Sequence, residues 1–366
     1  MKAVRFPAAA AALLVVALLS TCVRPADHRS NDEYDVGIAE SDGLAVTVRD
    51  GQAAVRQLSE QKLMLWAQAP HLEIRLQSDR ARSILLEVRN CMPDAQLSFG
   101  GATFQASSKP RATWCVYELD LPAGESNLLV APPDWQDETR YRFADMGDIQ
   151  TAMGSVHEVF EAISAVEDLR FVMSTGDVVE KGAIAEYDFF QEQLAALDIP
   201  FFSTIGNHEL TQSILRWHTR FGRYSVHFNF KGVDFSYVDS GNASLDPQLH
   251  EQLQGWLDAG QERVHIFGTH YPLFDPIGVR NAGFRSRNEA SKLLVNLAKG
   301  KVDLTLYGHV HSLYEFENAN IPAYISGGGG ALPERLDGID RHFLIVEVDP
   351  VENRVVSVEA SRVSTP

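Results

Sequence analysis

Five short polar segments of the sequence carry Asp, Asn and His, the side chains that bind pairs of divalent cations through oxygen and nitrogen. They are Asp145–Asp148, Gly176–Glu180, Gly206–Glu209, Thr269–Tyr271 and Gly308–His311. Each segment comes where a short apolar run ends, which is the pattern of a buried strand followed by a loop. Ligands of an open α/β sheet bind at the carboxyl ends of its strands. The pattern therefore predicts a metal-dependent active site at one sheet edge.

The elements that must position these segments alternate between strands and helices after Arg140. Apolar residues recur at helical spacing in three segments, Val156–Asp168, Tyr187–Leu197 and Asp246–Leu257. Two consecutive strand candidates, Tyr224–Phe230 and Val233–Asp239, have no helix between them, so a wholly parallel sheet is excluded. We expect an α/β (α+β) four-layer domain over residues 138–366, in which helices flank two packed mixed β-sheets.

The region before this domain has the pattern of short strands. Alternating, β-branched or aromatic segments are Leu44–Val48, Leu72–Leu76, Ile84–Val88 and Trp114–Leu119. Breaks that contain Gly or Pro separate them, and no helical periodicity interrupts them. We expect an antiparallel β-sandwich domain over residues 37–133, which packs beside the enzyme domain or holds it off a membrane. It carries no candidate catalytic residue.

The first residues have the features of a secretory signal peptide. Lys2 and Arg5 precede the apolar run Ala8–Leu19, whose twelve residues fall short of the roughly 20 that a transmembrane helix needs. The sequence Leu19–Cys22 resembles the lipobox of bacterial lipoproteins, although Thr21 stands where Gly, Ala or Ser is usual. We expect residues 1–22 to be a signal peptide and the protein to be exported, either free in the periplasm or anchored through a lipid on Cys22.

A conventional signal peptide, cleaved near Thr21 or Ala26, is the alternative to lipidation. Residues 23–36 are polar and without periodicity, which predicts a flexible tether. In an exported protein we expect Cys91 and Cys115 to form a disulfide worth ~3 kcal/mol, and two unrelated buried thiols are the alternative.

The composition limits the classes of partner. The 366 residues are more than one hydrophobic core usually serves, so two domains are expected. The net charge of −17 argues against a nucleic-acid docking surface, because such surfaces are basic. A phosphorylated small-molecule substrate fits an acidic enzyme better, and the oligomeric state is left open.

The identity and order of the five motifs resemble the calcineurin-like metallophosphoesterase superfamily. The motifs are Asp-x-Gly, Gly-Asp-x-x, Gly-Asn-His-Glu, a single His and Gly-His-x-His, over Asp145–His311. The resemblance implies a metal-dependent phosphoric ester hydrolase with two divalent or trivalent ions, such as Fe, Zn or Mn. Asp177 would bridge the ions. Asp145 and His311 would hold the first, and the second would be held by Asn207, His270 and His309.

The same resemblance implies how such a site would work. The two ions would orient the phosphoryl oxygens and lower the pKa of a bridging water, which gives a hydroxide for in-line attack. His208 would contact the phosphate and protonate the leaving oxygen.

Two positions depart from the family pattern. Gly147 stands where many members have His, and Glu180 stands where the purple acid phosphatases have Tyr. A purple enzyme is therefore not expected. Glu180, Asp148 or a water could complete the shell of the first ion.

Three functions remain open. The pattern at Gly147 is closest to the purple-acid-phosphatase-like branch and favours an exported phosphomonoesterase. A phosphodiesterase or pyrophosphatase that acts on nucleotides or lipid-linked phosphates is the second possibility. The third, a non-catalytic lipoprotein that retains the fold, is disfavoured by the complete set of metal ligands.

Overall fold

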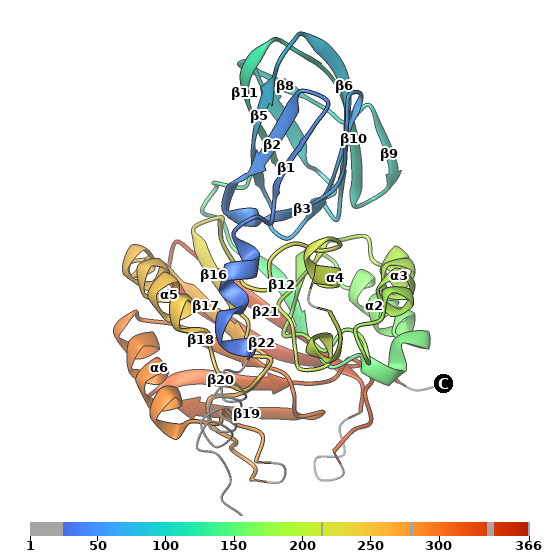
Figure 1. Ribbon diagram of the computed structural model, residues 1–366. Coiled ribbons are helices and arrows are strands. Elements are labelled where there is room, and N and C mark those ends of the chain that lie inside the picture. The colour runs from blue at the N-terminus through green and yellow to red at the C-terminus, as the bar shows by residue number, and fades with distance from the viewer. Residues whose placement is uncertain (1–24, 214, 279–280, 335–339, 365–366) are drawn as a thin grey trace, which may run out of the picture.

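The computed structural model describes residues 25–213, 215–278, 281–334 and 340–364. The predicted signal peptide, Cys22 and the first two residues of the predicted tether lie outside these ranges. Figure 1 shows an upper body made of strands and a lower body in which helices lie on both sides of central sheets. This arrangement confirms the predicted fold class. Within the described residues, none of the helices has both the length and the apolar character needed to cross a lipid bilayer.

The upper body is a sandwich of two sheets. One sheet has the order β1-β2-β5-β11-β7-β8, formed by Ile38–Ser41, Leu44–Val48, Leu72–Ser78, Gly124–Ala131, Gln96–Phe99 and Ala102–Phe104. The other has the order β3-β4-β6-β10-β9, formed by Ala53–Ser59, Lys62–Ala67, Arg82–Arg89, Trp114–Leu121 and Ser108–Arg111. Alternate residues of β5 are buried, as expected for a strand with one face on a core.

Two details of the sandwich differ from the sequence expectation. Strand β4 pairs with β6 in parallel, so the sandwich is not wholly antiparallel. The alternation of side chains is the same for both strand directions, so the sequence pattern does not distinguish them. The predicted disulfide is absent, because Cys91 and Cys115 are buried free thiols. The two thiols are in contact, and burial together with the neighbouring Cys115 raises the pKa of Cys91.

The lower body contains the two predicted mixed sheets. The first has the order β14-β13-β12-β21-β22, formed by Phe201–Ser203, Leu169–Ser174, Tyr141–Met146, His342–Asp349 and Arg354–Arg362. The second has the order β15-β16-β17-β18-β20-β19, formed by Val226–Phe230, Val233–Val238, His265–Thr269, Leu304–Tyr307, Ile321–Ser326 and Leu313–Asn318. In each sheet the parallel strands direct their carboxyl ends to one edge.

Aromatic side chains join the two sheets face to face. The ring of Phe143 on β12 lies 5.1 Å from that of Phe235 on β16, and Phe171 on β13 lies 5.4 Å from Phe235. Helices cover the outer faces, namely α2 (His157–Ser164), α3 (Ile184–Gln193), α5 (Pro247–Gly260) and α6 (Arg287–Lys299). The result is the expected order of helix, sheet, sheet and helix.

The shorter elements lie mainly in the loops at the sheet edges. They are α4 (Leu215–His218) and the 3₁₀ helices η1 (Pro25–Glu33), η2 (Arg49–Gly51), η3 (Gln150–Gly154), η4 (Leu194–Ala196) and η5 (Glu209–Thr211). The predicted helix start at Asp246 is confirmed. Asp246 is the N-cap, its carboxylate accepts the backbone N–H of Gln248, and Pro247 is the first helical residue.

The prediction of a flexible tether is wrong for Pro25–Glu33, which form η1. Arg29 of η1 forms a buried ion pair with Asp239 of the lower body, at 2.7 Å. Glu33 is buried as well and accepts the N–H of Ser225 at 3.2 Å. These long-range partners fix a segment whose own sequence has no periodic pattern.

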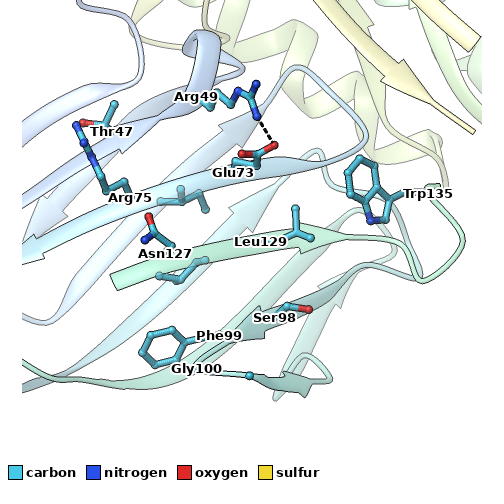
Figure 2. A pocket seen from close by; sticks show the side chains of 13 residues that line it. Thr47, Arg49, Glu73, Arg75, Ser98, Phe99, Gly100, Asn127, Leu129 and Trp135 are labelled. Carbon is cyan, nitrogen blue, oxygen red and sulfur yellow. Dashed lines mark hydrogen bonds and ion pairs between the residues drawn. The ribbon is translucent and has the colours of Figure 1, made fainter. Parts of the chain in front are cut away.

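Direct hydrogen bonds also join the two bodies. The side chain of Asn90 in the sandwich bonds both the N–H and the carbonyl of Phe201, each at 2.8 Å. A hollow of about 640 Å³ lies on the outer face of the first sandwich sheet, with Trp135 and Phe99 at opposite ends and Leu129 between them (Figure 2). None of the predicted metal ligands lines it, which directs attention to the lower body.

Candidate active site

Four of the predicted ligands meet around the Asp177 carboxylate. His270 Nε2 lies 3.3 Å from Asp177 Oδ2 and 3.1 Å from Asn207 Oδ1. His309 Nδ1 lies 3.3 Å from the same His270 nitrogen. Possible ligand atoms of Asp177, His270 and His309 all lie within 4.8 Å of one another. These four residues form one half-site with the ligand set predicted for the second ion.

A second group of residues lies on the other side of Asp177. Gln150 Nε2 donates to Asp177 Oδ2 at 2.8 Å and lies 3.2 Å from His311 Nε2. Asp148 Oδ1 lies 3.5 Å from the same nitrogen of His311. Turning the Gln150 amide by half a rotation would present its oxygen to a cation. Asp148, Gln150 and His311 therefore form the other half-site, which shares Asp177.

The structure corrects the first predicted ligand. Asp145 is part of β12, and its Oδ1 accepts the Tyr237 hydroxyl at 2.8 Å from the facing sheet. Burial raises the pKa of Asp145 to about 7, and no ligand of either half-site contributes to that shift. The strand continues to Met146, so the loop begins later than the apolar run suggests. Asp148, rather than Asp145, is the carboxylate that lies within 3.5 Å of His311 Nε2.

The sequence contained a signal for this correction. Gly147-Asp148 repeats the pair Gly176-Asp177, and each pair follows a buried strand. If Asp148 is the first ligand, the residue two positions after it is Gln150. Gly147 is then no longer the residue at the position where many family members have His.

The backbone is unusual at the proposed ligands. Asp148, Gln150, Asp177 and His309 have φ values of 64°, 45°, 56° and 67°, a region that costs energy for residues other than Gly. Glycine is needed beside them, because a Cβ on Gly206 would lie 2.1 Å from Asp177 Oδ1. Backbone strain that persists at four residues of one site is typical of a functional centre.

Backbone carbonyl groups orient three of the imidazoles. His270 Nδ1 lies 3.0 Å from the Thr175 carbonyl and His311 Nδ1 lies 2.8 Å from that of Leu332. His208 Nδ1 likewise bonds the Glu180 carbonyl at 2.6 Å. When the Nδ1–H donates to a carbonyl, Nε2 is left for a metal or a substrate. His208 Nε2 lies 3.9 Å from Asp177 Oδ2, so this ring also faces the site.

The charges of the site suit cations. Burial alone would raise the pKa of Asp177, but His270 and His208 hold it well below its usual range. Burial would lower the pKa of His270, but Asp177 and Asp148 raise it to about 9. The negative charge of these carboxylates thus favours a positive charge at His270. An imidazole that binds a metal ion is neutral, and the ion then supplies the positive charge. Asp148 Oδ1 is buried and lacks a hydrogen-bond partner. Both observations fit two divalent ions among oxygen and imidazole donors.

Sequence reasoning missed the role of Glu209. Its Oε2 accepts the N–H groups of Asp177 at 3.0 Å and Gly206 at 2.7 Å, and its Oε1 accepts that of Val179. Burial, followed by the charge of Asp177, raises the pKa of Glu209 to about 7. The side chain fastens the Asp177 loop to the loop that carries Asn207. The only sequence signal for this role was that Glu209 directly follows the Gly-Asn-His motif.

Glu180, the other open position, lies on the side of His208. Its carboxylate is 3.6 Å from His208 Nδ1. Asp148 and Gln150, rather than Glu180, are the residues that the structure brings to His311.

Comparisons with known proteins show the family of the lower body. Residues 141–313 match the family model for calcineurin-like phosphoesterases. The lower body therefore belongs to this family and is the domain of a metal-dependent phosphoric ester hydrolase. The sandwich lies outside the matched residues.

Two curated relatives match parts of the chain. A probable cyclic nucleotide phosphodiesterase of Xenorhabdus bovienii is 21% identical over 207 residues, which are 51% of this chain and 80% of the relative. A probable glycerophosphodiester phosphodiesterase, GpdQ, of Arcobacter nitrofigilis is 25% identical over 158 residues, which are 38% of this chain and 56% of the relative. The chain thus spans little more than half of the second relative.

A solved structure shows the same fold. The purple acid phosphatase PPD1 from yellow lupin (Lupinus luteus) seeds superposes with a TM-score of 0.55 at 14% identity, over 80% of this chain and 72% of that one. This likeness concerns the fold alone.

Proposed function

We propose that this chain hydrolyses phosphodiesters at a two-metal site formed by Asp148, Gln150, Asp177, Asn207, His270, His309 and His311. The observation that carries the proposal is the convergence of two half-sites on one shared carboxylate, that of Asp177. Two ions bound there would orient the phosphoryl oxygens and lower the pKa of a water between them.

The protein's own groups supply the remaining functions. Asp177 faces both half-sites, and its position is fixed by the backbone N–H of His208, which donates to Oδ1 at 2.8 Å. The His208 ring is held by the Glu180 carbonyl and is partly exposed, so its Nε2 can reach a bound ester. Protonated at Nε2, His208 would donate that proton to the leaving oxygen.

Two observations favour a diester over the monoester preferred from the sequence. The monoester preference depended on Gly147, and in the site proposed here the first motif begins at Asp148 instead. Next to His311 lies a hollow of about 270 Å³, walled by Gly327, Gly328 and Ala331. A diester has a second organic substituent that could fill such a space, whereas a monoester does not. The names of both curated relatives agree with a diester.

Hydrolysis of matched esters tests this proposal. With Mn²⁺, Zn²⁺ or Fe²⁺ added to metal-depleted protein, we expect a higher kcat/KM for bis(p-nitrophenyl) phosphate than for p-nitrophenyl phosphate. Asp177→Asn is the inactive control, because it removes the shared negative charge. A preference for the monoester would restore the phosphomonoesterase interpretation. Two bound ions with no hydrolysis of either ester or of nucleotides would indicate a non-catalytic protein.

We also propose that the protein is exported and anchored through Cys22. Support comes from Lys2, Arg5 and the apolar run up to Leu19. Arg29 comes seven positions after Cys22, a span of at most about 25 Å when extended. Because Arg29 is fixed to the lower body, an anchor at Cys22 would hold the active site close to the bilayer.

Cys22→Ala should release the protein from membranes and leave hydrolysis unchanged. A lipid contributes attachment only, and the proposed ligands lie between Asp148 and His311, more than a hundred residues further along the chain. Membrane fractionation and ester hydrolysis, each compared with the unchanged chain, measure the two effects. Equal membrane association with and without Cys22 would contradict the lipobox interpretation.

A further inference from the structure

The segment before the sandwich is part of the folded catalytic domain. Figure 1 shows η1 lying along the front of the lower body, between α4 and α5. Arg29 Nε and Nη2 bond the two carboxylate oxygens of Asp239, at 2.7 Å and 2.9 Å. Both side chains are only 6% exposed. Such a bidentate, buried pair fixes the orientation of both partners.

Asp239 begins a turn directly after β16. Its Oδ1 also accepts the N–H of Gly241 at 2.8 Å, and its own N–H donates to Ser225 Oγ at 3.0 Å. Without Arg29, the Asp239 carboxylate would be a buried charge with no cation bonded to it. The conformation of the turn Asp239–Gly241 therefore depends on Arg29.

One side of this turn supports the loop that carries His270. Ser240 Oγ accepts the N–H of Tyr271 at 2.9 Å, and Tyr271 directly follows His270. The Tyr271 ring in turn lies against His309, with centroids 3.8 Å apart. The turn thus supports His270 and, through the Tyr271 ring, contacts His309, and both imidazoles belong to the half-site predicted for the second ion.

The other side of the turn touches the loop of Asn207. A Cβ on Gly241 would lie 2.7 Å from the carbonyl oxygen of Gly206, the residue before Asn207. The two backbones are therefore in direct contact. In the described part of the chain, Asp148, Gln150 and His311 of the other half-site have no hydrogen bond to the turn Asp239–Gly241.

We propose that Arg29 is a positioning residue for the second metal ion, acting through the turn Asp239–Gly241 on Asn207 and His270. The inference rests on the proposed two-metal site. Ligands must be held at fixed distances for tight metal binding. A loosened turn should weaken the half-site of Asn207, His270 and His309 and leave that of Asp148 and His311 intact.

Metal titration of the metal-free, full-length protein tests the proposal. We expect two Mn²⁺ ions in the unchanged chain. In Arg29→Met, one dissociation constant should rise about 10- to 100-fold, as for the loss of other residues that orient ligands, while the other stays the same. Arg29→Lys keeps the charge but not the two-pronged geometry, so it should give an intermediate value. Hydrogen exchange at the Tyr271 amide should speed up in the metal-free Arg29→Met variant.

Lys231→Met is the matched control. Lys231 forms another largely buried ion pair, 2.7 Å from Asp134 at the joint of the two bodies, and its side chain is 4% exposed. This variant should lower Tm without changing either metal constant. Ser240→Ala removes the acceptor for Tyr271 without touching the ion pair, and it should weaken the same single ion even if Arg29→Met does not fold.

The outcomes separate this inference from the proposed function. Two unchanged constants in Arg29→Met and in Ser240→Ala would overturn the role of Arg29. Equal weakening of both ions, or the same loss in Lys231→Met, would reduce it to general stability and also overturn it. If the unchanged chain binds no metal, the two-metal proposal itself fails.

Discussion

Replacing Asp148 by Asn is expected to weaken binding of one metal ion more than about a hundredfold and nearly to abolish ester hydrolysis. Residues that only orient ligands already contribute 10- to 100-fold to metal affinity, so a lost charged ligand should cost at least as much. The variant keeps the size of the side chain and its place beside His309, whose N–H bonds Asp148 Oδ2 at 2.9 Å. Metal content and kcat/KM are the measurements.

Asp145→Asn is the matched control for this result. An amide oxygen in that position can still accept the Tyr237 hydroxyl, and burial already favours a neutral group there, since it raises the pKa of Asp145 to about 7. Asp145→Asn should still bind both ions. Its rate of hydrolysis should stay within about tenfold of that of the unchanged chain, which corresponds to about 1.4 kcal/mol of activation free energy. The reverse pattern, in which Asp145→Asn loses the ion and Asp148→Asn keeps it, would restore the ligand set predicted from sequence.

Replacing His208 by Ala should reduce hydrolysis by about 10²- to 10⁴-fold for esters with poor leaving groups. The reason is that an alkoxide needs a proton on departure, and His208 Nε2 is the ring nitrogen that the Glu180 carbonyl does not occupy. For p-nitrophenyl esters the loss should be clearly smaller, because p-nitrophenolate leaves without a proton. Steady-state kinetics of alkyl and p-nitrophenyl esters in parallel give the comparison.

Metal content is the control for His208→Ala. The proposed ligand set does not include His208, so two ions should still bind. A lost ion would make His208 a ligand. An equal loss of rate on both kinds of ester would make it a phosphate contact with no role in proton transfer.

Local sequence patterns predicted much of the fold. Strand β2 was expected at Leu44–Val48 and has those bounds, because alternation marks a half-buried strand without reference to its neighbours. The N-cap Asp246 followed by Pro247 marked the start of α5 for a similarly local reason. Helix ends were less accurate, since α2 ends at Ser164 rather than Asp168. Helix α6 was not predicted.

The same locality explains the error at Asp145. A charged residue after an apolar run normally ends a buried strand, because an unpaired carboxylate is costly to bury. Here the hydroxyl of Tyr237 satisfies one carboxylate oxygen, so the strand continues and the loop begins at Gly147. The partner is 92 residues away in the chain, and no local pattern near Asp145 indicates it.

The sequence by itself determined the chemistry of this protein, since the order of five Asp, Asn and His motifs after strands defined a metal-binding sheet edge. Only the tertiary structure decided which carboxylate reaches that edge and which groups hold it in place. Gln150 and Glu209 each bond Asp177, and Arg29 bonds Asp239, and in all three cases the partner is distant in the sequence. Residue type fixes what a side chain can bind, whereas the packing of separate strands and loops fixes what it meets.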